Sequence, residues 1–141
     1  MEASTKTVTT SPQRKHVKTA ERPPVAVGHV RLRTHCVPET IDFFRAIGLR
    51  HIFRKETFGV LELRGGTHLV ISKRDKPIRR ATPAPFDIMV DDIEKTQRTY
   101  EKKGFEPTEI TSGTIHSSFF VRIPSGHKLK ITSSHAGNRP V

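Results

Sequence analysis

The strongest constraint on this chain is an internal repeat. Arg64–Ser72 reads RGGTHLVIS, and Pro124–Thr132, 60 residues later, reads PSGHKLKIT. A glycine, a leucine, an isoleucine and a hydroxyl residue match between the copies, in the pairs Gly66/Gly126, Leu69/Leu129, Ile71/Ile131 and Ser72/Thr132. A repeat of this kind predicts two similar units that share one core, with a binding site at the surface between them.

The segment before the first copy predicts a strand and then a helix. Residues 29–34 alternate apolar and polar side chains, as a strand does. Ile41, Phe44 and Ile47 then form an apolar stripe that predicts a helix, which ends at Gly48. Three further strand-like segments follow, LRHIFRKE, FGVLELR and THLVISKR. The first half therefore reads as one βαβββ unit.

The second half repeats this order. FDIMV predicts a strand, and the helix after it ends at Gly104. We predict that Asp91 caps this helix, with Glu94 three residues later completing a capping box. Strand-like segments around PTEITS, HSSFFVRI and HKLKITS follow. The fold class is therefore predicted as α+β, with two βαβββ units that form a curved mixed sheet around a central cleft.

Composition divides the chain into an arm, a domain and a tail. Residues 1–27 are basic and polar, which predicts a disordered arm, and residues 135–141 read as a flexible tail. The single domain spans 28–134, with unit one at 28–74, unit two at 85–134 and a linker at 75–84. No stretch reaches membrane-spanning length, and the single cysteine, Cys36, allows no intrachain disulfide. We therefore expect a cytoplasmic protein without membrane contact.

The net charge of the 141 residues is +11. The arm contributes five Lys or Arg and two Glu, or +3, so +8 remains for the rest of the chain. A charge of this size favours anionic partners, whether small molecules or nucleic acid. Aromatic residues are few and mostly have the spacing of core residues, which makes a nucleic-acid surface the less favoured of the two.

Three segments together resemble the vicinal oxygen chelate superfamily, which includes glyoxalase I, bleomycin-resistance proteins and extradiol dioxygenases. They are GHVRLRT with ETIDFFRAIGL, FDIMVDDIEKTQRTYEKKGF, and IPSGHKLKIT. The resemblance covers residues 28–134 and implies two βαβββ units around a cleft. In metal-dependent members, side chains from the first and last strands of the units bind a divalent ion there.

Carried over residue by residue, the resemblance puts the metal-ligand positions at His29, Val70, Pro85 and Lys130. Only His29 could coordinate a metal, because Val70 and Pro85 have no donor and the ammonium of Lys130 would repel a cation. We therefore expect no metal and no cofactor. The alternative is a rearranged histidine site that uses His68, His116 or His127.

Strand alternation predicts which side chains line the cleft. The residues expected to face the helices are Val30, Leu32, Leu69, Ile71, Phe86, Ile88, Leu129 and Ile131. Their neighbours then face the cleft, and the ligand-binding candidates among these are His29, Arg31, Glu62, His68, Asp87, Met89, Phe120, Arg122 and Lys130. Two explanations of the charges are open. Either Lys130 or Arg31 pairs with Glu62 or Asp87, or the cations bind an anion beside Phe120 and Met89.

Three functions follow from these predictions. The leading one, which the resemblance implies, is metal-independent binding of an anionic or amphipathic small molecule by a protein that is a homodimer. The first alternative is a lyase, isomerase or related enzyme in which His29 acts as general acid or base and Lys130 stabilises a developing oxyanion. The second is nucleic-acid or regulatory binding through the basic arm and the segment KRDKPIRR.

Overall fold

A computed structural model of the chain describes residue 18 and residues 20–141, so most of the predicted arm lies outside the described residues. By its contacts the chain divides into two parts, and Ala26–His135 is the compact part that carries every helix and strand the structure describes. The described residues of the other part, Lys18, 20–25 and Ala136–Val141, form neither helix nor strand. The predicted domain limits, with a disordered arm and a flexible tail, stay predictions.

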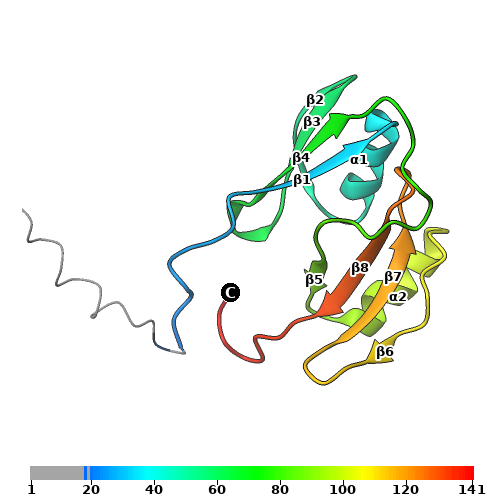
Figure 1. The fold of residues 1–141 in the computed structure, drawn as a ribbon. Helices are drawn as coiled ribbons and strands as arrows, with labels where there is room; N and C mark the ends of the chain where they lie inside the picture. The colour runs from blue at the N-terminus through cyan, green and yellow to red at the C-terminus, as the bar shows by residue number, and fades with distance from the viewer. Residues whose placement is uncertain (1–17, 19) are drawn as a thin grey trace, which may run out of the picture. The chain divides into compact units, whose positions relative to one another are not determined.

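Unit one folds as a βαβββ unit, as its sequence pattern predicts (Figure 1). The last two strands are joined by a short 3-10 turn that contains the Gly65-Gly66 pair. Its elements are β1 (His29–Thr34), α1 (Val37–Ala46), β2 (Arg50–Lys55), β3 (Phe58–Glu62), the 3-10 turn Arg64–Gly66, and β4 (His68–Lys73).

Unit two has the same order of elements, with shorter first and second strands. Its elements are β5 (Ile88–Val90), α2 (Ile93–Lys102), β6 (Thr111–Ser112), β7 (Ser117–Arg122) and β8 (Lys128–Ser133). The strand predicted around PTEITS is limited to Thr111–Ser112, and the start of that segment is Pro107, which has no N–H to donate to a ladder. Thr108 nevertheless contacts β7, because its N–H donates to the carbonyl of Phe120.

The eight strands form two four-stranded mixed sheets, one in each unit, and this confirms the predicted α+β fold class. The orders are β1-β4-β3-β2 and β5-β8-β7-β6, and in each sheet the first strand runs parallel to the last. Leu32 pairs with Ile71 in one sheet, and Ile88 pairs with Ile131 in the other. The two units are therefore equivalent residue by residue in these strands, as the sequence repeat predicts.

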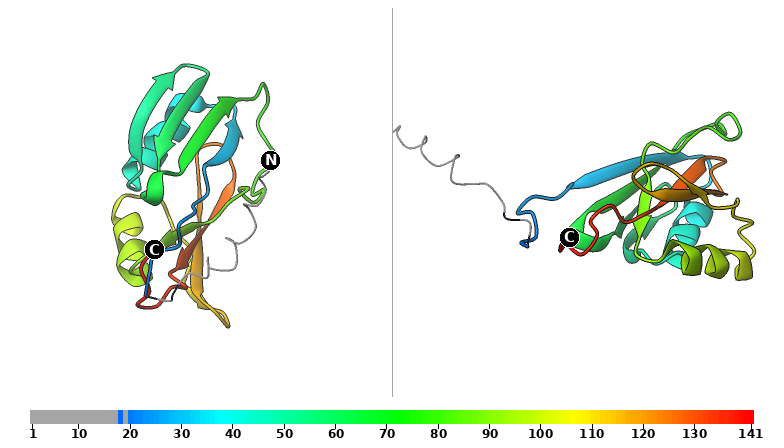
Figure 2. Two further views of the ribbon diagram at one scale, coloured as in Figure 1. Left: turned by 90° about the vertical axis from the view of Figure 1, so that its left-hand side faces the viewer. Right: turned by 90° about the horizontal axis from the view of Figure 1, so that it is seen from below.

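Each sheet buries one face and leaves the other more accessible. Helix α1 packs on β2, β3 and β4, and α2 packs on β7 and β8, as the views in Figures 1 and 2 show. The helix-facing side chains predicted from alternation are buried or half-buried in the structure, and the strictly buried ones include Leu32, Ile71, Leu129 and Ile131. The predicted register is therefore correct in both sheets.

One hydrophobic core extends through both units. The ring of Phe43 in α1 lies 4.9 Å from that of Phe105, and the ring of Phe44 lies 6.2 Å from that of Phe86. The thiol of Cys36 also donates to the carbonyl of Pro124, with the sulfur 3.3 Å from the oxygen. Neither unit thus completes its core alone, which agrees with the expectation for a duplicated fold.

The predicted cap of the second helix is wrong by one residue. The N-cap of α2 is Asp92, whose carboxylate accepts a hydrogen bond from the N–H of Lys95. The third helical position is therefore Lys95, and Glu94 cannot complete a capping box. Asp91 instead forms an ion pair with Arg64, which lies in the other unit.

Neither helix in the described part of the chain has the length and apolar run needed to cross a membrane.

Candidate functional site

Three predicted ligand-binding residues lie in one row across the exposed face of the first sheet. His68 is the register partner of both His29 in β1 and Glu62 in β3. The rings of His29 and His68 are 5.9 Å apart in an edge-on arrangement, and His68 Nε2 lies 3.3 Å from Glu62 Oε2. Adjacent strands thus bring together residues that are up to 39 positions apart in the sequence.

Glu62 makes two charged contacts in this row. Its Oε2 contacts His68, and its Oε1 forms an ion pair with Arg50 Nη1 at 3.0 Å. A carboxylate that contacts a ring nitrogen of a histidine fixes the orientation of that ring. The arrangement can therefore hold a histidine in one orientation while an arginine beside it balances the charge of the carboxylate.

The equivalent face of the second sheet carries cations and an aromatic ring. Lys130 is the register partner of Phe120, and Lys128 is the register partner of Arg122. The ammonium of Lys128 lies over the ring of Phe120, 4.5 Å from its centroid. Met89, 37% exposed, lies on the neighbouring strand β5, while Asp87 is exposed just before it. This face can therefore offer positive charge next to an apolar surface.

The structure does not form the charge pairs that would have explained these cations. Glu62, one predicted partner of Lys130 or Arg31, is bound by Arg50 and His68 instead. Among the residues that the structure describes, neither Lys130 nor Arg31 has a carboxylate oxygen within 4.0 Å. The predicted pairing failed because Arg50 is the register partner of Glu62 and reaches it directly across the β2–β3 pair.

The four metal-ligand positions implied by the resemblance do not supply a donor set. Val70 is the register partner of Arg31, and only 8% of it is exposed. Pro85 precedes β5, and Lys130 is half-buried in β8. Within the described residues, no three His, Cys, Asp or Glu side chains are grouped so that they could hold a metal ion. The residues present at these positions therefore do not fit a divalent ion.

The other histidines named for a rearranged site lie in different surroundings from His29 and His68. His127 is buried in the β7–β8 turn, where its Nδ1 lies 2.6 Å from Ser125 Oγ. Burial, and after it the positive charge of Arg74, lower the pKa of His127. The ring of His116 instead packs 4.8 Å from that of His135. These contacts give His127 and His116 local structural roles.

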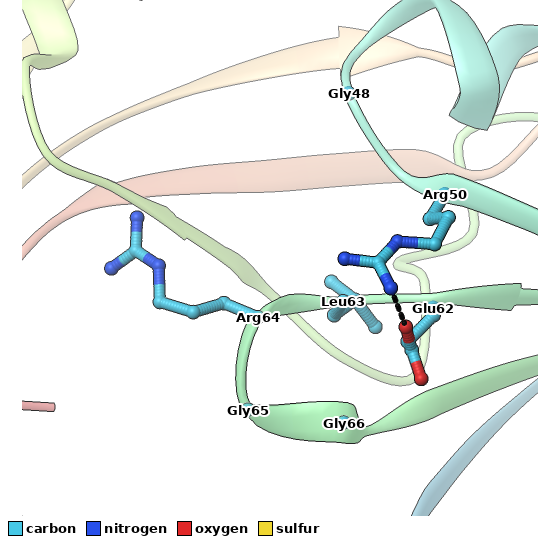
Figure 3. Close-up of a pocket in the computed structure, with 7 residues that line it drawn as sticks. All are labelled: Gly48, Arg50, Glu62, Leu63, Arg64, Gly65 and Gly66. Atoms are coloured by element: carbon cyan, nitrogen blue, oxygen red, sulfur yellow. Dashed lines mark ion pairs between the residues drawn. The ribbon is translucent and has the colours of Figure 1, made fainter.

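Sequence reasoning missed a pocket at the edge of the first sheet. It has a volume of about 490 Å³ and is formed where α1 leads into β2 and where β3 turns into β4. Its lining residues are Gly48, Arg50, Glu62, Leu63, Arg64, Gly65 and Gly66, as Figure 3 shows. The only signal in the sequence was the RGG turn, and nothing local indicated that Arg50 would lie beside it.

Comparison with known proteins finds similarity in structure alone. The sequence matches no protein-family model and no curated protein. The fold is similar to a lactoylglutathione lyase from Agrobacterium tumefaciens, with a TM-score of 0.66 and 14% identity over 83% of this chain and 99% of that one. It is also similar to a glyoxalase/bleomycin resistance protein/dioxygenase from Alicyclobacillus acidocaldarius, with a TM-score of 0.64 and 22% identity over 80% and 94% of the two chains.

A third similar structure is a bleomycin-binding protein from bleomycin-producing Streptomyces verticillus, solved with copper(II)-bleomycin. Its TM-score is 0.59 and its identity is 18%, over 77% of this chain and 97% of that one. At such identities the similarity establishes the fold and leaves the activity open.

Proposed function

Because this chain has the fold of the vicinal oxygen chelate proteins, to which glyoxalases and bleomycin-binding proteins belong, we propose that it binds an anionic small molecule without a metal ion. The ligand would contact the accessible sheet faces, where His29, Arg31, Lys130 and their neighbours lie. Binding by shape and charge needs no reacting group, so a protein with this function can dispense with the metal ligands.

Lys130 carries this proposal. Lys130 lies in the middle of β8 and is half-buried as a residue, with no carboxylate oxygen within 4.0 Å of its ammonium among the described residues. Partial burial of a charge is unfavourable unless a group of opposite charge accompanies it. A bound carboxylate or phosphate would provide that group and would accept a charge-assisted hydrogen bond.

The neighbours of Lys130 indicate what the rest of the ligand is like. Phe120 lies directly opposite, Met89 is partly exposed, and Lys128 adds a second positive charge over the aromatic ring. Such a surface suits an anion that also has an apolar or aromatic part. It suits a cationic ligand such as bleomycin poorly, so the bleomycin-binding neighbour is a guide to the fold and not to the ligand.

The proposal is tested by a thermal-shift screen of small anions, thiol conjugates and antibiotics. We expect anionic compounds to raise the unfolding temperature of the wild-type protein and to lose this effect in the Lys130→Gln variant. Lys102→Gln, which removes an exposed charge from α2, is the matched control and should respond as wild type. Stabilisation that persists unchanged in Lys130→Gln would contradict the proposal.

We also propose that the protein is a homodimer. Sedimentation equilibrium of the full chain measures its mass in solution and so tests this. A monomer that still binds the anion would contradict the homodimer and would leave the proposed anion binding in place.

An acid–base enzyme is the second candidate, and one observation favours it. His68 is held by Glu62, and His29 lies edge-on to His68, so one histidine is oriented by a carboxylate and a second is adjacent to it. The two rings would act as general acid and base, and Lys130 would stabilise negative charge that develops on a substrate.

This candidate is tested by turnover of the compounds that the screen identifies, with and without a chelator. Turnover that is lost in Glu62→Gln and in His29→Gln, and that is insensitive to the chelator, would favour the enzyme. If the wild-type protein binds these compounds without turning them over, the enzyme candidate is rejected and the binding function is retained.

A further inference from the structure

A second feature is the pocket at the edge of the first sheet, which lies at the end of the row of His29, His68 and Glu62 and shares Glu62 with it. Arg50 from β2 and Arg64 from the β3–β4 turn both line it, and Leu63 is the only apolar side chain among its lining residues. Figure 3 shows the Gly65-Gly66 turn following the backbone of Arg64, with the side chains of Arg64 and Arg50 on opposite sides of Leu63. Two guanidinium groups beside an open backbone turn form a surface that attracts oxyanions.

Each arginine is held by a carboxylate, Arg64 by Asp91 outside the pocket and Arg50 by Glu62 in its lining. Arg64 binds Asp91 through two hydrogen bonds, Nη1 to Oδ1 at 3.2 Å and Nη2 to Oδ2 at 3.0 Å. Arg50 uses Nη1 to bind Glu62. A guanidinium has five N–H groups, so both arginines keep donors for a further acceptor. The carboxylates thus orient the arginines without using all their hydrogen-bonding capacity.

Glycine keeps the pocket open. Gly48, Gly65 and Gly66 all have a positive φ, of 118°, 83° and 89° respectively. A Cβ atom built at any of these positions would meet nothing within 4 Å, so the backbone there faces open space. Two stretches of wall, at Gly48 and at Gly65-Gly66, are therefore bare backbone, which allows a small ligand to approach the main chain closely.

We propose that this pocket binds inorganic phosphate, with Arg50 and Arg64 holding its oxygens and Glu62 accepting a hydrogen bond from its P–OH group. Glu62 is the only acidic residue that lines the pocket, and an ionised carboxylate can only accept hydrogen bonds. Phosphate keeps at least one proton at neutral pH, whereas sulfate has none. The pocket should therefore prefer phosphate to sulfate, although the two anions have the same shape.

The test is an NMR titration of the full ¹⁵N-labelled chain with sodium phosphate and with sodium sulfate at constant ionic strength and pH. We expect the amide signals of Gly65 and Gly66 to shift with phosphate in a saturable way, and sulfate to bind about tenfold more weakly. Glu62→Gln should remove this preference, because an amide can donate to sulfate as well as accept from phosphate.

Asp91 provides a control that separates binding from structure. Arg64→Gln and Asp91→Asn both break the Arg64–Asp91 pair, so a merely structural effect would be the same in the two variants. If the pocket binds phosphate, Arg64→Gln weakens binding about tenfold, while Asp91→Asn keeps or improves it because the guanidinium is released. Arg98→Gln on α2 should bind phosphate as wild type does.

Two results would overturn the inference. One is a shift of the Gly65 and Gly66 amides that is unchanged in both Arg50→Gln and Arg64→Gln. The other is an equal response to sulfate and phosphate in the wild-type protein, which would remove the role of Glu62. Because Lys130 does not line this pocket, loss of the proposed ligand binding in Lys130→Gln leaves the phosphate response of the Gly65 and Gly66 amides unaffected.

Discussion

Val70 and Lys130 occupy equivalent places in the two units. Val70 lies opposite Val60 in the β3–β4 pair, and Lys130 lies opposite Phe120 in the β7–β8 pair. Both follow a leucine that is fully buried, so both side chains belong to the face of the sheet away from the helix. One unit thus has an apolar side chain and the other a cation where metal-dependent relatives of this fold would have a ligand.

This equivalence predicts that the protein does not depend on a divalent metal. A metal at one hundred times its Kd would stabilise the folded state by about 2.7 kcal/mol, which is several degrees of unfolding temperature. We expect that dialysis against a chelator and addition of Zn²⁺, Ni²⁺ or Mn²⁺ leave the unfolding temperature of the full chain unchanged. Native mass spectrometry that finds one equivalent of bound metal would contradict this prediction.

The cap of α2 gives a prediction that distinguishes two adjacent aspartates. Asp92→Ala should destabilise the protein by about 1 kcal/mol, because it leaves the N–H of Lys95 without its acceptor. Asp91→Ala should cost less, about 0 to 1 kcal/mol, since its pair with Arg64 is exposed to solvent. Urea unfolding of both variants measures the difference. A larger effect for Asp91 than for Asp92 would mean that the helix begins one residue earlier.

Gly59 allows a close contact between β3 and α1. A Cβ atom at this position would lie 2.3 Å from Ile41 Cδ1, and Ile41 is fully buried. Gly59→Ala should therefore destabilise the fold by about 1 to 3 kcal/mol through overpacking. Gly28→Ala is the matched control, because nothing lies within 4 Å of its Cβ position, and it should be nearly neutral.

A double-mutant cycle tests the cause. Ile41→Val removes the atom that clashes, so it should cost less in the Gly59→Ala background than in wild type. Additive effects of the two substitutions would show that the clash with Ile41 does not explain the loss of stability.

His127 predicts a loss of stability at acidic pH. Burial, and then the charge of Arg74, lower the pKa of His127 in the folded protein below its ordinary value of 6.5. The unfolded chain therefore takes up this proton at a higher pH than the folded chain does. The contribution of neutral His127 to the free energy of unfolding is therefore complete above pH 6.5. It is lost as the pH falls toward the pKa of His127 in the folded protein.

The measurement is urea unfolding between pH 7.5 and pH 5.5. Wild type should lose more stability over this range than His127→Asn, whose amide does not titrate. Arg74→Gln should raise the pKa of His127 toward its ordinary value, which an NMR titration of the ring detects. Equal pH dependence of wild type and His127→Asn would show that His127 does not contribute.

Much of the fold could be predicted because strand alternation and helix stripes are local patterns. The equivalence of Leu69 with Leu129 and of Ile71 with Ile131 is visible in the repeat, and strand alternation places His29, His68 and Lys130 on the faces away from the helices. The helix cap was misplaced because two adjacent aspartates give the same local signal. Only the turn geometry and the position of Arg64 decide which of the two caps the helix.

The sequence by itself determined the duplication, the order of elements, the buried face of each strand and the absence of donors at Val70 and Pro85. These properties depend on side-chain identity and on a period of two residues, which neighbouring positions reveal. Only the tertiary structure decided that Glu62 binds Arg50 and His68, and that Arg50, Arg64 and the Gly65-Gly66 turn enclose one pocket. The ion pairs that charged side chains form depend on which strands are neighbours. Pairing between segments that are distant in the sequence decides which strands are neighbours.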